Sequence, residues 1–194
     1  MFFFSIVSHN QSNLSYDLVI SLLSSQSVVV HYIENDPMST LIDIDDSNLI
    51  KFQNKKPKGF VENHNFAYRR LNLKNNDIFV ICNPDISYVV TEFKKFLLLE
   101  KKLSNEVATI RIVDNNGDAE DNIREKLNIT NFFKRLLFRK SSKYLSNNYW
   151  FAGMFVFCRS DVFNKLNGFD ESFFLYCEDA DFCYRARSLS IKLN

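Results

Sequence analysis

The chain has 194 residues, a formal net charge of +1 at pH 7, and 46% hydrophobic residues. This length and composition fit one large folded domain and exclude a disordered chain. The near-neutral charge lacks the basic field of nucleic-acid-binding proteins, so we expect no nucleic-acid partner. No apolar run approaches the length of a membrane span, and the apolar start lacks the basic leader of a signal peptide.

Four cysteines are present, and none of them forms a Cys-x-x-Cys pair. They are Cys82, Cys158, Cys177 and Cys183. Since they stand mostly in apolar runs, we expect buried, reduced thiols in a cytoplasmic protein, and no zinc site.

Apolar runs alternate with amphipathic segments along the first 113 residues. The sequence predicts strands at residues 2–7, 28–33, 49–52, 78–82 and 107–113. The spacing of apolar residues predicts helices at residues 14–23, 60–71 and 91–103. This alternation predicts an α/β fold with a mainly parallel central sheet flanked by helices. In such sheets, ligands bind beyond the carboxyl ends of the strands.

The second part of the chain is less regular. Residues 114–131 are polar, and residues 150–158 are apolar again. A short helix is predicted at residues 161–166, with Gly168 as its left-handed cap. Another helix is predicted at residues 179–189. Its core-facing side chains would be Phe182, Cys183, Ala186 and Leu189.

Asn83-Pro84-Asp85 follows the strand predicted at residues 78–82. Pro84 has no N–H to donate to a ladder, so the strand must end there, leaving Asp85 at the edge where a ligand would lie. A carboxylate in that place suits Mg²⁺ or Mn²⁺. A plain turn that closes the strand explains the same three residues.

Carboxylates gather again near the end of the chain. Asp170 and Glu171 follow Gly168, and Glu178, Asp179 and Asp181 stand between aromatic residues. A carboxylate aimed into a cleft can act as a general base toward a hydroxyl. Acidic residues also favour helix N-termini, so simple capping, with Asp179 as the N-cap, is an equal reading of these residues alone.

The segment of residues 132–143, from Phe132 to Lys143, mixes aromatic and basic side chains. A basic amphipathic helix of this kind can lie on an anionic membrane surface. A helix packed on the domain with its basic side in water is the alternative.

Taken in order, these motifs resemble family 2 of the glycosyltransferases, inverting enzymes of the GT-A fold, and within it the bacterial rhamnosyltransferase-like branch that builds O-antigen and capsule. Trp150 to Arg187 carries the strongest likeness. The matching motifs are Ser5-Ile6-Val7-Ser8-His9-Asn10, Glu34-Asn35, Gly59-Phe60 through Asn63 and Asn65, Asn83-Pro84-Asp85, Ala152-Gly153-Met154, Gly168-Phe169-Asp170-Glu171, Phe174-Leu175-Tyr176 and Glu178-Asp179-Ala180-Asp181-Phe182.

The resemblance implies a role for each motif. Asp85 would bind Mg²⁺ or Mn²⁺, Asp179 would be the catalytic base with Glu178 beside it, and Asp170 and Glu171 would bind the acceptor. The donor would be bound by Ser8, Asn10, Glu34, Asn35, Asn65, Asn83 and Gly153.

By this resemblance the chain is one GT-A-like domain, with a Rossmann-like nucleotide-sugar-binding half at residues 1–113 and an acceptor-side half at residues 114–194. Family members continue past this point, so we read the chain as C-terminally incomplete. We expect inverting transfer from a dTDP- or UDP-sugar to a hydroxyl of a glycan or lipid-linked glycan, a cell-surface polysaccharide precursor. The alternative is a non-catalytic remnant that binds nucleotide sugars. We expect either to work in the cytoplasm, where the segment of residues 132–143 would allow peripheral contact with the inner face of the membrane.

Overall fold

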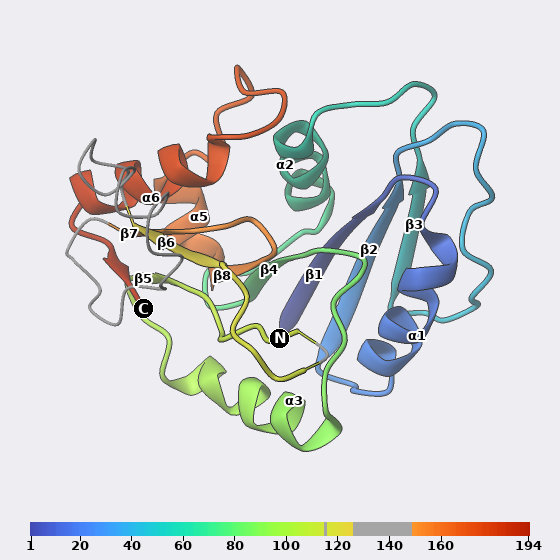
Figure 1. Ribbon diagram of the computed structural model, residues 1–194, viewed down its shortest axis with the longest axis horizontal. Helices are drawn as coiled ribbons and strands as arrows, with labels where there is room; N and C mark the ends of the chain where they lie inside the picture. The colour runs from blue at the N-terminus through green and yellow to red at the C-terminus, as the bar shows by residue number, and fades with distance from the viewer. Residues whose placement is uncertain (115, 126–148) are drawn as a thin grey trace.

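The computed structural model describes residues 1–114, 116–125 and 149–194, which form helices on both faces of a seven-stranded sheet (Figure 1). The sheet has the strand order β3-β2-β1-β4-β8-β5-β9, and a small sheet pairs β6 with β7. The strands are β1 Phe2–Ser8, β2 Val28–Glu34, β3 Leu49–Gln53, β4 Ile78–Cys82, β5 Glu106–Ala108, β6 Ile123–Glu125, β7 Tyr149–Phe151, β8 Phe155–Arg159 and β9 Lys192–Leu193.

The large sheet is mainly parallel, as predicted. Neighbouring strands from β3 through β4 are parallel, and so are β5 and β9. Strand β8 lies between β4 and β5 and is antiparallel to both. The sheet therefore combines strands from both predicted halves of the chain, and the expected α/β class is confirmed.

The helices divide between the two faces of this sheet. One face is covered by α1 Ser12–Leu23 and α3 Val90–Leu97, which continues into the 3-10 helix η1 Leu98–Lys101. The other face is covered by α2 Phe60–Arg70, α5 Ser160–Lys165 and α6 Glu178–Ser188. None of the described helices is long and apolar enough to cross a membrane.

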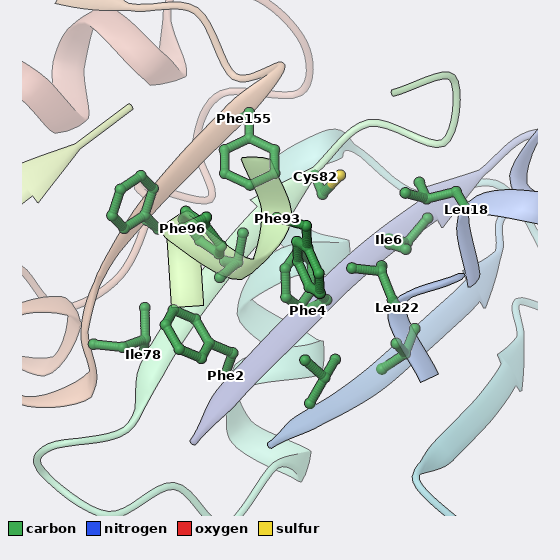
Figure 2. Packing of buried hydrophobic residues seen from close by; sticks show 14 of the residues in the cluster. Phe2, Phe4, Ile6, Leu18, Leu22, Ile78, Cys82, Phe93, Phe96 and Phe155 are labelled. Atoms are coloured by element: carbon green, nitrogen blue, oxygen red, sulfur yellow. The ribbon is translucent and has the colours of Figure 1, made fainter. Parts of the chain in front are cut away.

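Aromatic side chains fill the first face. Phe2, Phe4 and Ile6 alternate along β1 toward α1 and α3 (Figure 2). The rings of Phe2 and Phe96 lie 5.0 Å apart between centroids. On the second face, Phe79 of β4 meets Phe163 of α5 at 4.9 Å. Because the central strands are buried on both faces, they are continuous apolar runs, as parallel sheets require.

Several predicted boundaries need correction. The strand expected at residues 107–113 ends at Ala108, because Thr109 turns its hydroxyl to the Phe155 carbonyl and Asn122 binds the Ile110 carbonyl. The helix expected at residues 91–103 becomes a 3-10 turn after Leu97. The apolar run at residues 150–158 divides between β7 and β8.

Two side chains expected in the core are exposed. Leu189 follows the end of α6, outside the helical face that Phe182 and Ala186 bury. Cys177 precedes that helix in a left-handed conformation and is also exposed. Cys82, Cys158 and Cys183 are buried free thiols, as predicted, and burial raises the pKa of each of them.

Candidate active site

The carboxyl ends of the parallel strands bring together residues from three distant parts of the sequence. Ser8 ends β1 and pairs with Glu34 at the end of β2. On the other side of β1, Ile6 pairs with Cys82, the last residue of β4 before Asn83-Pro84-Asp85. This is the edge at which sheets of this kind bind ligands.

Glu34 is fully buried at this edge, and its carboxylate accepts hydrogen bonds from three donors of the protein itself. The Ser8 hydroxyl donates to Oε2 at 2.8 Å, and the backbone N–H groups of Asn10 and Asp36 donate to Oε1 at 3.0 Å each. Asn10 has a positive φ of 57° and is exposed. Glu34 thus joins the loop after β1 to the loop after β2.

Asn35 belongs to a cluster of amide side chains. Its Oδ1 accepts hydrogen bonds from Asn54 at 2.7 Å, from Asn63 at 3.1 Å and from the Lys58 N–H at 2.9 Å. Asn54 and Asn63 are buried and also bond to each other. Neither was in the predicted donor set. Their burial is a property of the tertiary structure, and an isolated asparagine in the sequence carries no signal for it.

Asn65 was predicted to bind the donor, and the structure places it against the acceptor-side motif. Its amide donates to the Phe169 carbonyl at 2.9 Å and to Glu171 at 3.0 Å, and it accepts from the Phe169 N–H at 3.0 Å. Gly168 makes this contact possible, because a Cβ there would lie 2.6 Å from the Asn65 oxygen. Asn65 therefore fixes α2 to the Gly168–Glu171 segment.

Asp85 is exposed and lines a cavity of about 310 Å³ together with Asn83, Asp114, Glu120 and Met154. Within the described residues, no three His, Cys, Asp or Glu side chains gather closely enough to hold a metal ion. One carboxylate at an open edge still fits Mg²⁺, which proteins usually hold through one or two carboxylates, with phosphate oxygens and water completing the shell.

Gly153 connects this edge to α2. The next residue, Met154, accepts the Asn83 N–H at 2.9 Å. A Cβ on Gly153 would lie 2.9 Å from the Phe60 ring, so any larger residue there would require the ring to move. Phe60 in turn donates its N–H to the Phe174 carbonyl at 3.1 Å. These contacts form a continuous path from Asn83 to the acidic segment before α6.

Asp170 and Glu171 line a cavity of about 590 Å³ with Asn65, Arg69 and Arg185. Arg69 donates to Glu171 at 2.8 Å, and this bond lowers the pKa of the Glu171 carboxyl. The Ser172 N–H lowers the pKa of Asp170 in the same way. Both carboxyl groups are therefore held in the ionised form.

Glu178 and Asp179 occupy the first turn of α6. The helix begins at Glu178 after Cys177, so the N-cap position predicted for Asp179 belongs to Cys177. Asp179 is partly exposed, whereas Glu178 is buried with its Oε2 unpartnered among the described residues. Burial first, and then the neighbouring Asp179, raise the pKa of Glu178. The two carboxyl groups thus differ in exposure.

Residues 132–143, the predicted membrane-contacting segment, lie outside the described residues.

This sheet order, with β8 reversed between β4 and β5 and helices on both faces, is the GT-A fold of glycosyltransferases. GalNAc-T7 and TarS are among the solved structures that share it. GalNAc-T7, solved with UDP, GalNAc and Mn²⁺, matches with a TM-score of 0.67 and 14% identity, over 100% of this chain and 41% of that one. TarS 1-349 of S. aureus matches with a TM-score of 0.60 and 15% identity, over 95% of this chain and 54% of that one.

In sequence, the chain is 42% identical over 45 residues to rhamnosyltransferase WbbL of Escherichia coli (strain K12). This stretch is 23% of the chain and 17% of that protein. No family model matches the chain. It spans less than two thirds of each of these proteins. The matches confirm the predicted resemblance to the GT-A glycosyltransferases of the family 2 type.

Proposed function

We propose that this chain transfers a sugar, with inversion, from a UDP- or dTDP-sugar to a hydroxyl of a cell-surface polysaccharide precursor. One observation carries the proposal: contacts run from Asn83 through Met154, Gly153 and Phe60 to the Phe174 carbonyl, four residues before Glu178 at the start of α6. This supports a donor site at Asp85 and an acceptor site at α6 held by one frame, as joining a donor to an acceptor requires.

The donor half of the proposal rests on the strand ends. Ser8, Glu34 and Asn35 shape the two loops that would receive the nucleoside, with Asn10 exposed between them. Asn83 and Gly153 would border the donor sugar. Asp85 would hold Mg²⁺ or Mn²⁺ together with the diphosphate oxygens, and such an ion offsets the charge on the departing nucleoside diphosphate.

The acceptor half rests on α6. Asp179 would take the proton of the acceptor hydroxyl as its oxygen attacks the anomeric carbon. The bond between that carbon and the diphosphate oxygen breaks at the same time, and the nucleoside diphosphate leaves with the electron pair. Asp170 and Glu171, both kept ionised, would accept hydrogen bonds from acceptor hydroxyls. Buried Glu178 would support Asp179 without touching the acceptor.

The test is release of UDP or dTDP from a panel of nucleotide sugars with Mn²⁺ or Mg²⁺, in the wild type and in Asp85→Ala and Asp179→Asn. Asp45→Asn, a change at an exposed loop carboxylate, is the matched control. We expect both site variants to lose at least about a hundredfold in rate, Asp179→Asn because the general base is lost and Asp85→Ala because the metal ligand is lost. Equal rates in all four proteins would reject the site assignment. Binding of a nucleotide sugar without turnover would identify the non-catalytic alternative.

Peripheral membrane contact, on the cytoplasmic face, is a separate part of the proposal and rests on sequence alone. Reversing the charges of Arg135, Arg139 and Lys140 should release the protein from vesicles with anionic lipids. If the wild type does not sediment with such vesicles, this part fails while the transfer proposal stands.

A further inference from the structure

The loop before α6 exposes three large apolar side chains in a row. Phe174 is 69% exposed, Leu175 51% and Tyr176 76%. Single exposed apolar residues are ordinary on protein surfaces, whereas a contiguous group of them marks a place of contact. The loop stands three residues before Asp179, so this surface adjoins the proposed catalytic base.

The loop is fixed in this exposed position. The Phe174 carbonyl accepts the Phe60 N–H at the start of α2, and a Cβ on Gly59 would lie only 2.7 Å from that oxygen. Tyr176 and Cys177 both have a φ of 69°, a conformation that costs a non-glycine residue on the order of 1 kcal/mol. The fold therefore holds the apolar side chains outward at some cost in stability.

Charge decides which kind of partner fits. The segment from Asp170 to Asp181 contains five acidic residues and no lysine or arginine. Arg69 pairs with Glu171 and Arg185 with Asp181. In the described part of the chain, this leaves Asp170 and Asp179 as partly or fully exposed carboxyls beside the loop that form no ion pair with an arginine. Such a surface is repelled by anionic lipid, so an ordinary bacterial membrane is a poor partner.

A neutral pyranose ring fits both features. The C–H face of the sugar can lie on an aromatic ring. Its hydroxyls can donate hydrogen bonds to ionised carboxylates, which are acceptors and not donors. We propose that Phe174 and Tyr176 form an aromatic platform that receives a neutral sugar ring of the acceptor, next to Asp179. The identity of the ligand as the acceptor rests on the proposed function.

The experiment uses saturation-transfer NMR with a mixture of methyl glycosides of glucose, galactose, N-acetylglucosamine and rhamnose as probes. Wild type is compared with the double variant Phe174→Ala/Tyr176→Ala. The matched control is Tyr184→Ala, which removes an aromatic residue that is 67% exposed on α6 itself. We expect at least one glycoside to bind the wild type and the control, and its Kd to rise about tenfold or more in the double variant.

Two further measurements separate the possible failures. Affinity for UDP and dTDP should be unchanged in the double variant, since the Phe174 carbonyl that accepts the Phe60 N–H belongs to the backbone and is kept in alanine. A parallel loss would indicate misfolding, and Tyr176→Ala alone then serves as the milder variant. Unchanged glycoside binding, or none in the wild type, would overturn the platform. So would loop-dependent binding to vesicles, or loop-dependent dimerisation. If glycosides bind through the loop but no nucleotide sugar is turned over, the proposed function fails and the platform stands.

Discussion

The hydroxyl of Ser8 donates a 2.8 Å hydrogen bond to the carboxylate of Glu34, and both side chains are fully buried. The same carboxylate accepts the N–H groups of Asn10 and Asp36. Complete burial and three hydrogen bonds leave this carboxylate little capacity to bind a nucleobase. The hydrogen bonds that Glu34 accepts hold the loops after β1 and β2 in one geometry.

Glu34→Gln should therefore weaken the binding of all nucleoside diphosphates to the same extent. The amide NH₂ cannot accept the hydrogen bonds that Glu34 receives, and a buried donor left unsatisfied costs about 1–3 kcal/mol. Calorimetry with UDP, dTDP and CDP measures this, with Glu92→Gln, a change at an exposed residue of α3, as control. A loss confined to UDP and dTDP would mean that Glu34 reads the base directly.

Replacing Glu178 and Asp179 of α6 one at a time should give opposite results. Asp179→Asn should abolish transfer if Asp179 is the base. Glu178→Gln should retain most activity and unfold at the same or a higher temperature, because burial disfavours the charged form of Glu178. Rates of nucleotide release and thermal melts decide the matter. A greater loss of activity in Glu178→Gln than in Asp179→Asn would assign the role of base to Glu178.

Gly168→Ala should destabilise the fold by about 2–4 kcal/mol. Its φ is +65°, and the new Cβ would lie 2.6 Å from the Asn65 oxygen that binds the Phe169 N–H. Gly117→Ala is the matched control, since Gly117 has a φ of +84° and no atoms within 4 Å of the added Cβ. Its cost should stay near 1 kcal/mol. Equal denaturant midpoints for the two variants would show that the Asn65 contact is unimportant.

Stability should fall as the pH drops from about 6.5 toward 4. His31 and His64 are buried between the sheet and α2, and burial lowers their pKa values to about 4 and about 3. In this range the histidines are protonated in the unfolded chain but not in the folded chain. Each histidine therefore lowers the free energy of unfolding by on the order of 1 kcal/mol per pH unit. Below about 4, only His64 continues to contribute.

Urea unfolding across this pH range measures the effect. His31→Leu should flatten the pH dependence, because it removes a ring whose two nitrogens have no partner among the described residues. His9→Asn, a change at an exposed histidine, should leave the dependence as it is. A His31→Leu profile as steep as that of the wild type would contradict the assignment.

The sequence was sufficient for the parallel part of the fold, since β1, β2 and β4 are apolar runs between amphipathic helices. It did not predict β8 between β4 and β5, because an apolar run carries no information about strand direction or sheet position. Asp85 and Asp179 were predicted as site residues from local motifs alone. Most hydrogen-bond partners of Glu34 and Asn65 lie 24 or more residues away in the sequence. The remaining partner of Glu34, the Asp36 N–H, lies in a turn whose geometry depends on the fold. Local patterns cannot specify them.

The position of β8 also has a consequence for biosynthesis. Strand β5 follows β4 in the chain but never pairs with it, because β8 separates the two. While the ribosome adds the residues between Ala108 and Phe155, the completed β4 therefore presents an open apolar edge. Edges of this kind recruit other chains. The nascent protein is thus most vulnerable to aggregation during this interval, and a chaperone bound there would protect it until β8 emerges.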